Sequence, residues 1–172
     1  CGAGGTFVVI KKADGTFSPL IVAGGAGGNI SETDDDGYCD APLGEFGNGP
    51  SGENNMDIGS RGKSGDIDKY NGGAGYESDA PGATSDYPRC FHSGLIGGKD
   101  TIQGSYHGGF GGGGSGGWKS GGGGGYTGGN GSPGEGPAGG GGSFCADKSG
   151  ENELELDGWR RSGKCIIRYI TK

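Results

Sequence analysis

The chain has 172 residues, of which 49 are glycine, about four times the usual share of ~7%. Leucine, isoleucine, valine and phenylalanine together supply only 24 residues, a fraction below the ~20% at which composition ordinarily indicates disorder. The formal net charge of −7 disfavours nucleic acid as a partner, because binding to it rests on neutralising phosphates. Composition therefore excludes an ordinary hydrophobic core and long helices, since each interior glycine costs a helix ~1 kcal/mol.

The length allows one domain, which we predict to cover residues 1–172. No stretch approaches the ~18 apolar residues that a membrane-spanning helix requires, and no signal-peptide pattern is present. Because the chain begins with Cys1, we expect it to be a processed product or a fragment.

Residues 6–22 carry the clearest strand signal. Residues 6–10 and 20–22 are rich in β-branched and aromatic side chains, and Asp14-Gly15 between them is a turn dipeptide. The pattern predicts a β-hairpin. Pro19 predicts that the second strand begins late or lies at an edge of the sheet, because proline cannot donate to the strand ladder.

Residues 153–170 mirror this arrangement at the other end of the chain. Residues 153–156 alternate between charged and apolar side chains, Asp157-Gly158 is a second turn dipeptide, and residues 164–170 are strand-like. We expect both ends to pair in one antiparallel sheet or β-sandwich, which would close the domain.

Residues 29–105 form an acidic middle that is polar and rich in turn residues. Composition alone indicates disorder there, but two cysteines and scattered aromatic residues indicate that much of the segment is held in place. Asp34, Asp35 and Asp36 are weak calcium candidates through their carboxylate oxygens. They do not complete an EF-hand loop, so solvated acidic loops are favoured. No metal ion and no cofactor are predicted.

Residues 108–142 hold 22 glycines in 35 positions. One interpretation is a flexible linker. The other is a set of extended polyglycine-II-type helices with 3 residues per turn, which are stable only when neighbouring chains lie close enough to pair N–H and C=O groups laterally. Four aromatic residues favour order, because a stack of glycine helices needs side chains to cover its faces: Phe110, Trp118, Tyr126 and Phe144.

The expected fold is therefore mainly β with irregular structure. It is a β-sandwich or a small antiparallel sheet that carries a bundle of polyglycine-II-type helices, with almost no α-helix.

The five cysteines favour disulfide bonds over a zinc site, because no C-x-x-C pair is present. Disulfides imply an extracellular, secreted protein. We prefer the pairs Cys145–Cys165 and Cys39–Cys90, although four cysteines allow three connectivities. Cys1 then pairs with a cysteine further upstream, pairs between molecules, or is a lipid-modified N-terminus.

Two asparagines lie in glycosylation sequons. Asn29 is the possible acceptor. The second sequon, at Asn130, is disfavoured because Pro133 follows it.

No catalytic constellation is evident in the sequence. The two histidines, His92 and His107, lie in loop-like or glycine-rich stretches. Cys90 with His92 could form a thiol site, but a disulfide partner for Cys90 is favoured. The sequence predicts that the chain is not an enzyme.

Four segments resemble a known family in their order along the chain: GTFVV at 5–9, PLIVAGG at 19–25, GGFGGGG at 108–114 and GGGGGYTGG at 121–129. They resemble the extracellular glycine-rich domain of the anaplastic lymphoma kinase and leukocyte tyrosine kinase receptors, a module similar to those of many secreted glycine-rich proteins. The resemblance implies polyglycine-II-type helices packed hexagonally on a β-sandwich, and in the receptors this region binds a small protein ligand. The sequence contains neither a kinase nor a partner domain, so no ligand-contact residue is carried over.

The first functional hypothesis is a non-enzymatic extracellular module, a rigid scaffold for self-assembly in a matrix or coat or for protein–protein adhesion. The alternative is a ligand-binding ectodomain fragment of a receptor-like protein, for which Trp118, Tyr126 and Trp159 are the candidate binding aromatics. An ice-binding protein ranks third, because the chain carries many charged residues.

Overall fold

The structure is a computed structural model of the chain. It describes residues 1–29, 39–49, 63–65, 71–80, 87–100, 106–117, 119–132, 136–147 and 165–166. Over these residues the chain is mainly non-helical, with one three-stranded antiparallel sheet and one 3-10 helix, η1 (Phe91–Ser93). The expectation of a non-helical fold with a small antiparallel sheet and almost no α-helix is confirmed for this part of the chain.

The predicted N-terminal hairpin is present. Strands β1 (Thr6–Lys11) and β2 (Phe17–Ala23) pair antiparallel. In the turn between them, the Asp14 carboxylate accepts hydrogen bonds from the backbone N–H of Thr16, at 2.9 Å, and from its hydroxyl, at 2.6 Å. Gly15 has a φ of +83°, a left-handed conformation that glycine adopts without a steric cost. The local sequence thus specifies both the strands and the turn.

Pro19 does not delay the second strand. Strand β2 begins at Phe17 and lies between β1 and β3 (Phe144–Cys145) in the order of the sheet. Strand β3 pairs only with Ile21 and Val22, so at Pro19 the strand is paired on the β1 side alone. There Pro19 pairs with Val9, where the register shifts between Val8 and Val9, and a residue without an N–H is tolerated at such a position.

The third strand comes from the end of the glycine-rich region. Strand β3 pairs antiparallel with β2, with Ile21 opposite Cys145 and Val22 opposite Phe144. The predicted strands in residues 153–170 lie outside the described residues, apart from Cys165 and Ile166. The part of the prediction that concerns a β-sandwich stays a prediction.

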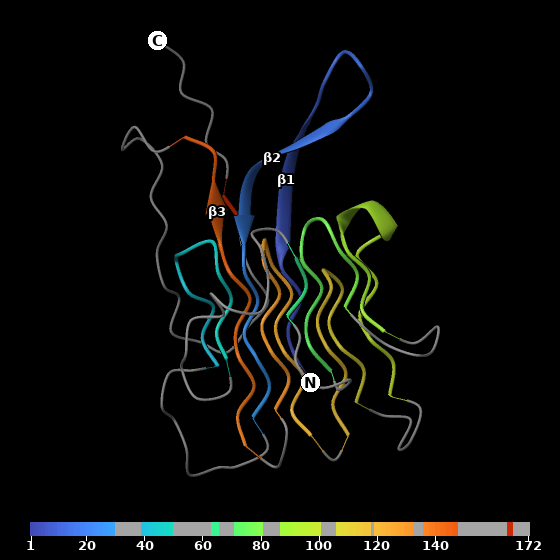
Figure 1. Cartoon of the computed structure of the whole chain (residues 1–172), viewed down its shortest axis with the longest axis vertical. Coiled ribbons are helices and arrows are strands. Elements are labelled where there is room, and N and C mark those ends of the chain that lie inside the picture. Colours follow the sequence, from blue (N-terminus) through green and yellow to red (C-terminus); the bar gives the residue numbers. More distant parts are fainter. Residues whose placement is uncertain are drawn as a thin grey trace.

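Below the sheet, extended segments from distant parts of the chain run side by side (Figure 1). They carry no strand assignment, yet backbone hydrogen bonds of about 2.7–3.3 Å join them laterally. We call this part of the molecule the glycine array, formed by the described parts of residues 1–5, 23–29, 39–49, 63–80, 87–100 and 106–143.

Residues 121–125 form the central row of the glycine array. Their N–H and C=O groups exchange backbone hydrogen bonds with six surrounding stretches of chain, represented by Ala3, Gly25 with Gly28, Asn71 with Ala74, Gly114, Gly129 and Gly139. The row is therefore enclosed on all sides by other backbones.

The hydrogen-bond partners of this row repeat every third residue. Gly122 and Gly125 both donate to the segment 71–74, whereas Gly123 and Gly124 donate to two other segments. The carbonyl groups of the row repeat in the same way. Successive N–H groups thus point in three directions around the row. A β-strand, by contrast, directs its groups to opposite sides with a period of two.

Close contact between backbones explains why the central row consists of glycine. A Cβ atom on Gly123 would lie under 3.0 Å from the carbonyl oxygen of Gly25, a separation that real Cβ atoms essentially never show. Gly122 and Gly124 face other backbone oxygens in the same way. A larger residue would force the rows apart and break the lateral hydrogen bonds.

An aromatic layer packs against one face of the sheet. Phe7, Val22 and Phe144 are cross-strand neighbours on that face, and Val22 is 0% exposed. Rings from other segments join them in a continuous series, in which Tyr126 stacks on Phe144 with 4.4 Å between ring centroids. The aromatic layer comprises Phe7, Phe17, Tyr76, Phe91, Tyr126 and Phe144.

We predict that Gly123→Ala lowers the free energy of unfolding by about 1–3 kcal/mol or more, because the added methyl group overpacks the central row. The matched control is Gly44→Ala, since a Cβ at Gly44 meets nothing within 4 Å, and its effect should stay within ~1 kcal/mol. Urea unfolding followed by circular dichroism measures both variants. Equal stability of the two would show that the central row is not closely packed.

Candidate functional site

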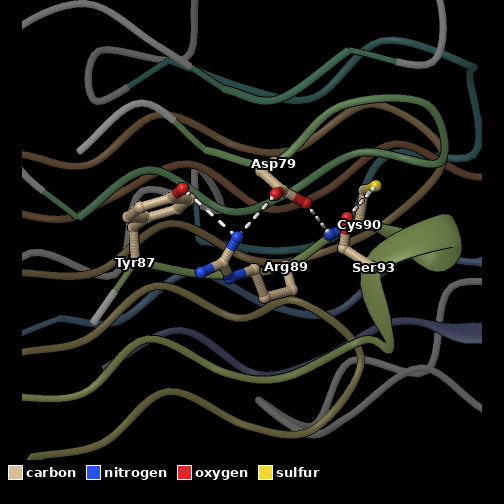
Figure 2. A network of polar contacts seen from close by, with 5 residues as sticks. All are labelled: Asp79, Tyr87, Arg89, Cys90 and Ser93. Atoms are coloured by element: carbon tan, nitrogen blue, oxygen red, sulfur yellow. Dashed lines mark hydrogen bonds and ion pairs between the residues drawn. The ribbon is translucent and has the colours of Figure 1, made fainter. Parts of the chain in front are cut away.

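A partly buried network of polar groups connects two neighbouring segments of the chain, residues 71–80 and 87–93, next to η1. Arg89 donates to the Asp79 carboxylate at 3.0 Å and to the Tyr87 hydroxyl at 3.2 Å. The backbone N–H of Cys90 donates to the other oxygen of Asp79 at 2.8 Å. Figure 2 shows Asp79 between Arg89 on one side and Cys90 with Ser93 on the other. One carboxylate thus holds residues 87–93 against the segment 71–80.

Ionisation of Asp79 is favoured by this network. Partial burial opposes the charged form, but hydrogen bonds from Cys90, Arg89 and Ser93 outweigh it and hold the pKa of Asp79 below its usual value. The same hydrogen bond with Asp79 raises the pKa of Arg89. The guanidinium also lies over the Tyr87 ring, 4.2 Å from its centroid. The pair is therefore held in its charged form by several directed contacts.

The geometry does not assemble the thiol site considered for Cys90 and His92. The Cys90 thiol lies 3.5 Å from the Ser93 hydroxyl, while the His92 ring contacts the rings of Tyr76 and Phe91. A nucleophilic cysteine needs a base within hydrogen-bond reach, and the imidazole contacts rings instead. The arrangement is suited to holding the loop in place.

Two exposed apolar residues lie on neighbouring stretches of backbone beside this network. Phe110 is 74% exposed and Ile96 is 52% exposed. The N–H of Gly111 donates to the carbonyl of Leu95 at 2.8 Å, which brings the two neighbouring residues together. We call Ile96 and Phe110 the apolar tip.

The backbone beside the apolar tip is held in an uncommon conformation. Leu95 has a φ of +57°, in the left-handed region that non-glycine residues rarely occupy. Its N–H donates to the carbonyl of Cys90 at 3.0 Å, which closes the turn after η1. Strained residues of this kind persist where the surrounding contacts fix them, often at functional positions.

The expectation that Phe110 covers the glycine array is wrong. Its backbone carbonyl faces Gly4 within the array, but its side chain is exposed to solvent. Gly111 and Gly112 follow with φ values of +100° and +82° and turn the chain back. The spacing of aromatic residues does not show which side of the backbone faces the array.

Of the three candidate binding aromatics, the structure describes Tyr126. Tyr126 is half-buried in the aromatic layer, where it stacks on Tyr76 and Phe144. Trp118 and Trp159 lie outside the described residues. Tyr126 therefore packs within the aromatic layer, and its role in binding stays a prediction.

The five cysteines fall in different surroundings, and all five are free thiols in the structure. Burial raises the pKa of the Cys165 thiol, and the charge of Cys145 raises it further. Cys39 and Cys90 are buried, and Cys1 is exposed. All of the pairings stay predictions.

The glycosylation and calcium candidates are only partly covered by the structure. Asn29 is half-buried at the end of the segment that follows β2. Asn130, in the disfavoured sequon, is buried, so this packing leaves no room for a glycan on its side chain. Asp34, Asp35 and Asp36 lie outside the described residues. Within the described ranges, no three His, Cys, Asp or Glu residues are grouped as they would be around a metal ion.

Compared with known proteins, the chain matches no family model and no curated sequence. The resemblance to the receptor glycine-rich domains thus rests on the four quoted segments. In the part of the chain that the structure describes, no helix is long and apolar enough to cross a membrane.

Sequence reasoning missed the Asp79–Arg89 pair and the apolar tip. The two charged residues are ten positions apart in a stretch without helical periodicity, so no spacing rule relates them. Ile96 follows a Gly94-Leu95 pair whose φ values are both positive. A glycine after the 3-10 helix was the single local signal for that turn.

We predict that Asp79→Asn lowers the free energy of unfolding by about 1–3 kcal/mol at pH 7, the range for hydrogen bonds to a charged group. The folded-state pKa of Asp79 lies below its unfolded value. The carboxylate therefore stabilises the fold above the unfolded pKa of ~3.9 and loses this contribution as the pH falls through the folded pKa. Urea unfolding at pH 7 and at pH 2–3 should show the difference between the two proteins shrink.

The control is Glu77→Gln, which removes an exposed ion pair with Lys63 at 3.1 Å. Exposed pairs contribute ~0–1 kcal/mol, so little change is expected. An Asp79→Asn deficit that is equally large at both pH values would assign the effect to packing rather than to charge.

Proposed function

We propose that the glycine array is a bundle of polyglycine-II-type helices, as the sequence predicts. The support is the threefold repeat of hydrogen-bond partners along residues 121–125 and their enclosure by other backbones. A polyglycine-II helix has three residues per turn and no internal hydrogen bonds. Each of its N–H groups must therefore find a partner on a neighbouring chain, and those of residues 122–125 do so.

On this basis the chain is a non-enzymatic extracellular module that acts through its surface, by self-assembly or by adhesion to another protein. The observation that carries the proposal is the apolar tip on a rigid backbone array. Phe110 and Ile96 are exposed and lie next to the strained Leu95. Large apolar side chains held outward on a rigid frame are suited to protein contact, because little conformational freedom is lost on binding.

The alternative is that the chain is part of a receptor-like ectodomain that binds a protein ligand. The same apolar tip would then face the ligand. The two functions differ in the partner, which is a second copy or a matrix or coat component in the first case and a soluble ligand in the second.

We predict that the purified chain self-associates in a concentration-dependent way and that Phe110→Ala combined with Ile96→Ser weakens this association at least tenfold. Because both side chains are exposed, the melting temperature should change by less than about 3 °C, as expected for surface substitutions. Sedimentation velocity over a range of concentrations measures the association.

The matched control is Leu43→Ala, another exposed apolar residue. It lies in the segment 39–49, which borders residues 138–143, away from the apolar tip. A chain that stays monomeric at millimolar concentration, and that binds no extracellular protein by way of the tip, would overturn the proposal. Weakening by Leu43→Ala alone would move the contact to another face.

A further inference from the structure

Strand β1 forms one edge of the sheet in the part of the chain that the structure describes. The strand order is β1–β2–β3, so β1 pairs with β2 on one side. In Figure 1 β1 lies on the side of β2 away from β3, and the hairpin projects beyond the glycine array. The edge of a sheet presents a row of backbone N–H and C=O groups that can pair with another chain.

Hydrogen bonds at the two ends of β1 show which of its backbone groups face this edge. The N–H of Gly5 donates away from β2, to the carbonyl of Gly111 at 3.0 Å, and the N–H of Lys12 donates within the hairpin, to the carbonyl of Thr16 at 2.8 Å. Successive residues of a strand direct these groups to alternate sides. The extra residue at the register shift belongs to β2, so the alternation along β1 is regular. The residues whose groups face the edge are Phe7, Val9 and Lys11.

Among the described residues, no backbone group is hydrogen-bonded to these three residues on the edge side. The backbone groups of Val8 and Ile10 face β2 instead. The edge is thus a row of three residues that begins where the bend at Gly111 ends, and each residue offers one donor and one acceptor.

We propose that this edge binds the β1 strand of a second copy of the chain, in an antiparallel pair centred on Val9. The inference rests on the proposed self-assembly and names the surface that performs it. In this register Val9 lies opposite its own counterpart, and Phe7 of each copy lies opposite Lys11 of the other. All three edge residues then exchange N–H···O=C bonds across the contact. No other antiparallel register pairs all three with one another.

The side chains of β1 favour an antiparallel pair over a parallel one. In a parallel pair in register, Lys11 and Lys12 would lie beside their own counterparts, and like charges in such positions are destabilising. In the antiparallel pair the apolar stem of Lys11 meets the ring of Phe7, and Val8 lies opposite Ile10. The pair therefore matches apolar groups and separates the charges.

The same contact brings exposed apolar residues of the two copies towards one another. The backbone at Gly5 is already paired with the bend at residues 110–112, so the hairpin turn of the second copy, residues 12–16, lies against that bend. The exposed residues beside the turn, Ile10 and Phe17, thereby approach the apolar tip. A two-fold contact of this kind closes on itself, so it builds a dimer.

The test is amide hydrogen exchange of the whole chain, followed by NMR, at one concentration below and one above the midpoint of self-association. The N–H groups of Phe7, Val9 and Lys11 should exchange about tenfold or more slowly in the associated protein. Those of Val8 and Ile10 should be equally protected in both samples, because they already face β2.

Two outcomes would overturn the pairing, and they differ in what else they overturn. An associated chain without added protection at the three edge residues would place the contact elsewhere and leave the proposed self-assembly intact. A chain that stays monomeric at millimolar concentration would overturn the pairing and the self-assembly together.

Two substitutions at Val9 separate backbone pairing from side-chain contact. Val9→Pro removes the N–H on the edge side, which the hairpin does not use, and should weaken dimer formation about tenfold or more in sedimentation velocity. Val9→Ala keeps the N–H and is the matched control, with a change of less than about threefold. Equal weakening by both would overturn the strand pairing. If Val9→Pro disturbs the hairpin, the exchange pattern of the unsubstituted chain decides.

Discussion

The lateral hydrogen bond between two extended backbones is the interaction on which the rest of this molecule depends. A buried N–H or C=O group without a partner is costly, and an extended chain has no hydrogen-bond partner within itself. The groups of residues 121–125 are paired with backbones on all sides. This is sterically feasible because no Cβ lies between the rows, as the contacts of Gly123 and its neighbours make clear. Among the described residues, the largest side chains that are fully buried are Val22, Thr127 and Ser120.

An interior made of backbone carries a large entropic cost, because glycine loses more conformational freedom on folding than any other residue. The features that offset this cost lie around the array. The sheet orients the first segments and the last one, the aromatic layer buries Val22 against Phe144 and Tyr126, and the Asp79–Arg89 pair ties two neighbouring segments together.

The parts of the fold that sequence could predict are those whose signals are local. The β1–β2 hairpin follows from β-branched residues around an Asp-Gly turn, and the sequence places it correctly. The effect of Pro19 could not be deduced in this way, because it depends on a register shift opposite Val9, which is a property of the pair of strands. In the glycine array, prediction from the sequence meets a more general limit. A glycine run contains no information about which neighbour each glycine will contact, so neither the central position of residues 121–125 nor the outward direction of Phe110 could be deduced.

The same constraint restricts where a specific function can be located. In the central row, a residue larger than glycine at 122, 123 or 124 would meet a neighbouring backbone and separate the rows. Large side chains are therefore found mainly in the sheet, in the aromatic layer and at the bends that connect the rows. At the bend formed by residues 110–112, two glycines with positive φ reverse the chain and leave Phe110 directed away from the array. The backbone of Leu95, itself held in a left-handed conformation, is hydrogen-bonded to this bend and is followed by the exposed Ile96. The rigidity of the array and the position of its exposed apolar residues thus have one origin, because close backbone packing leaves the bends as the places where large side chains can project.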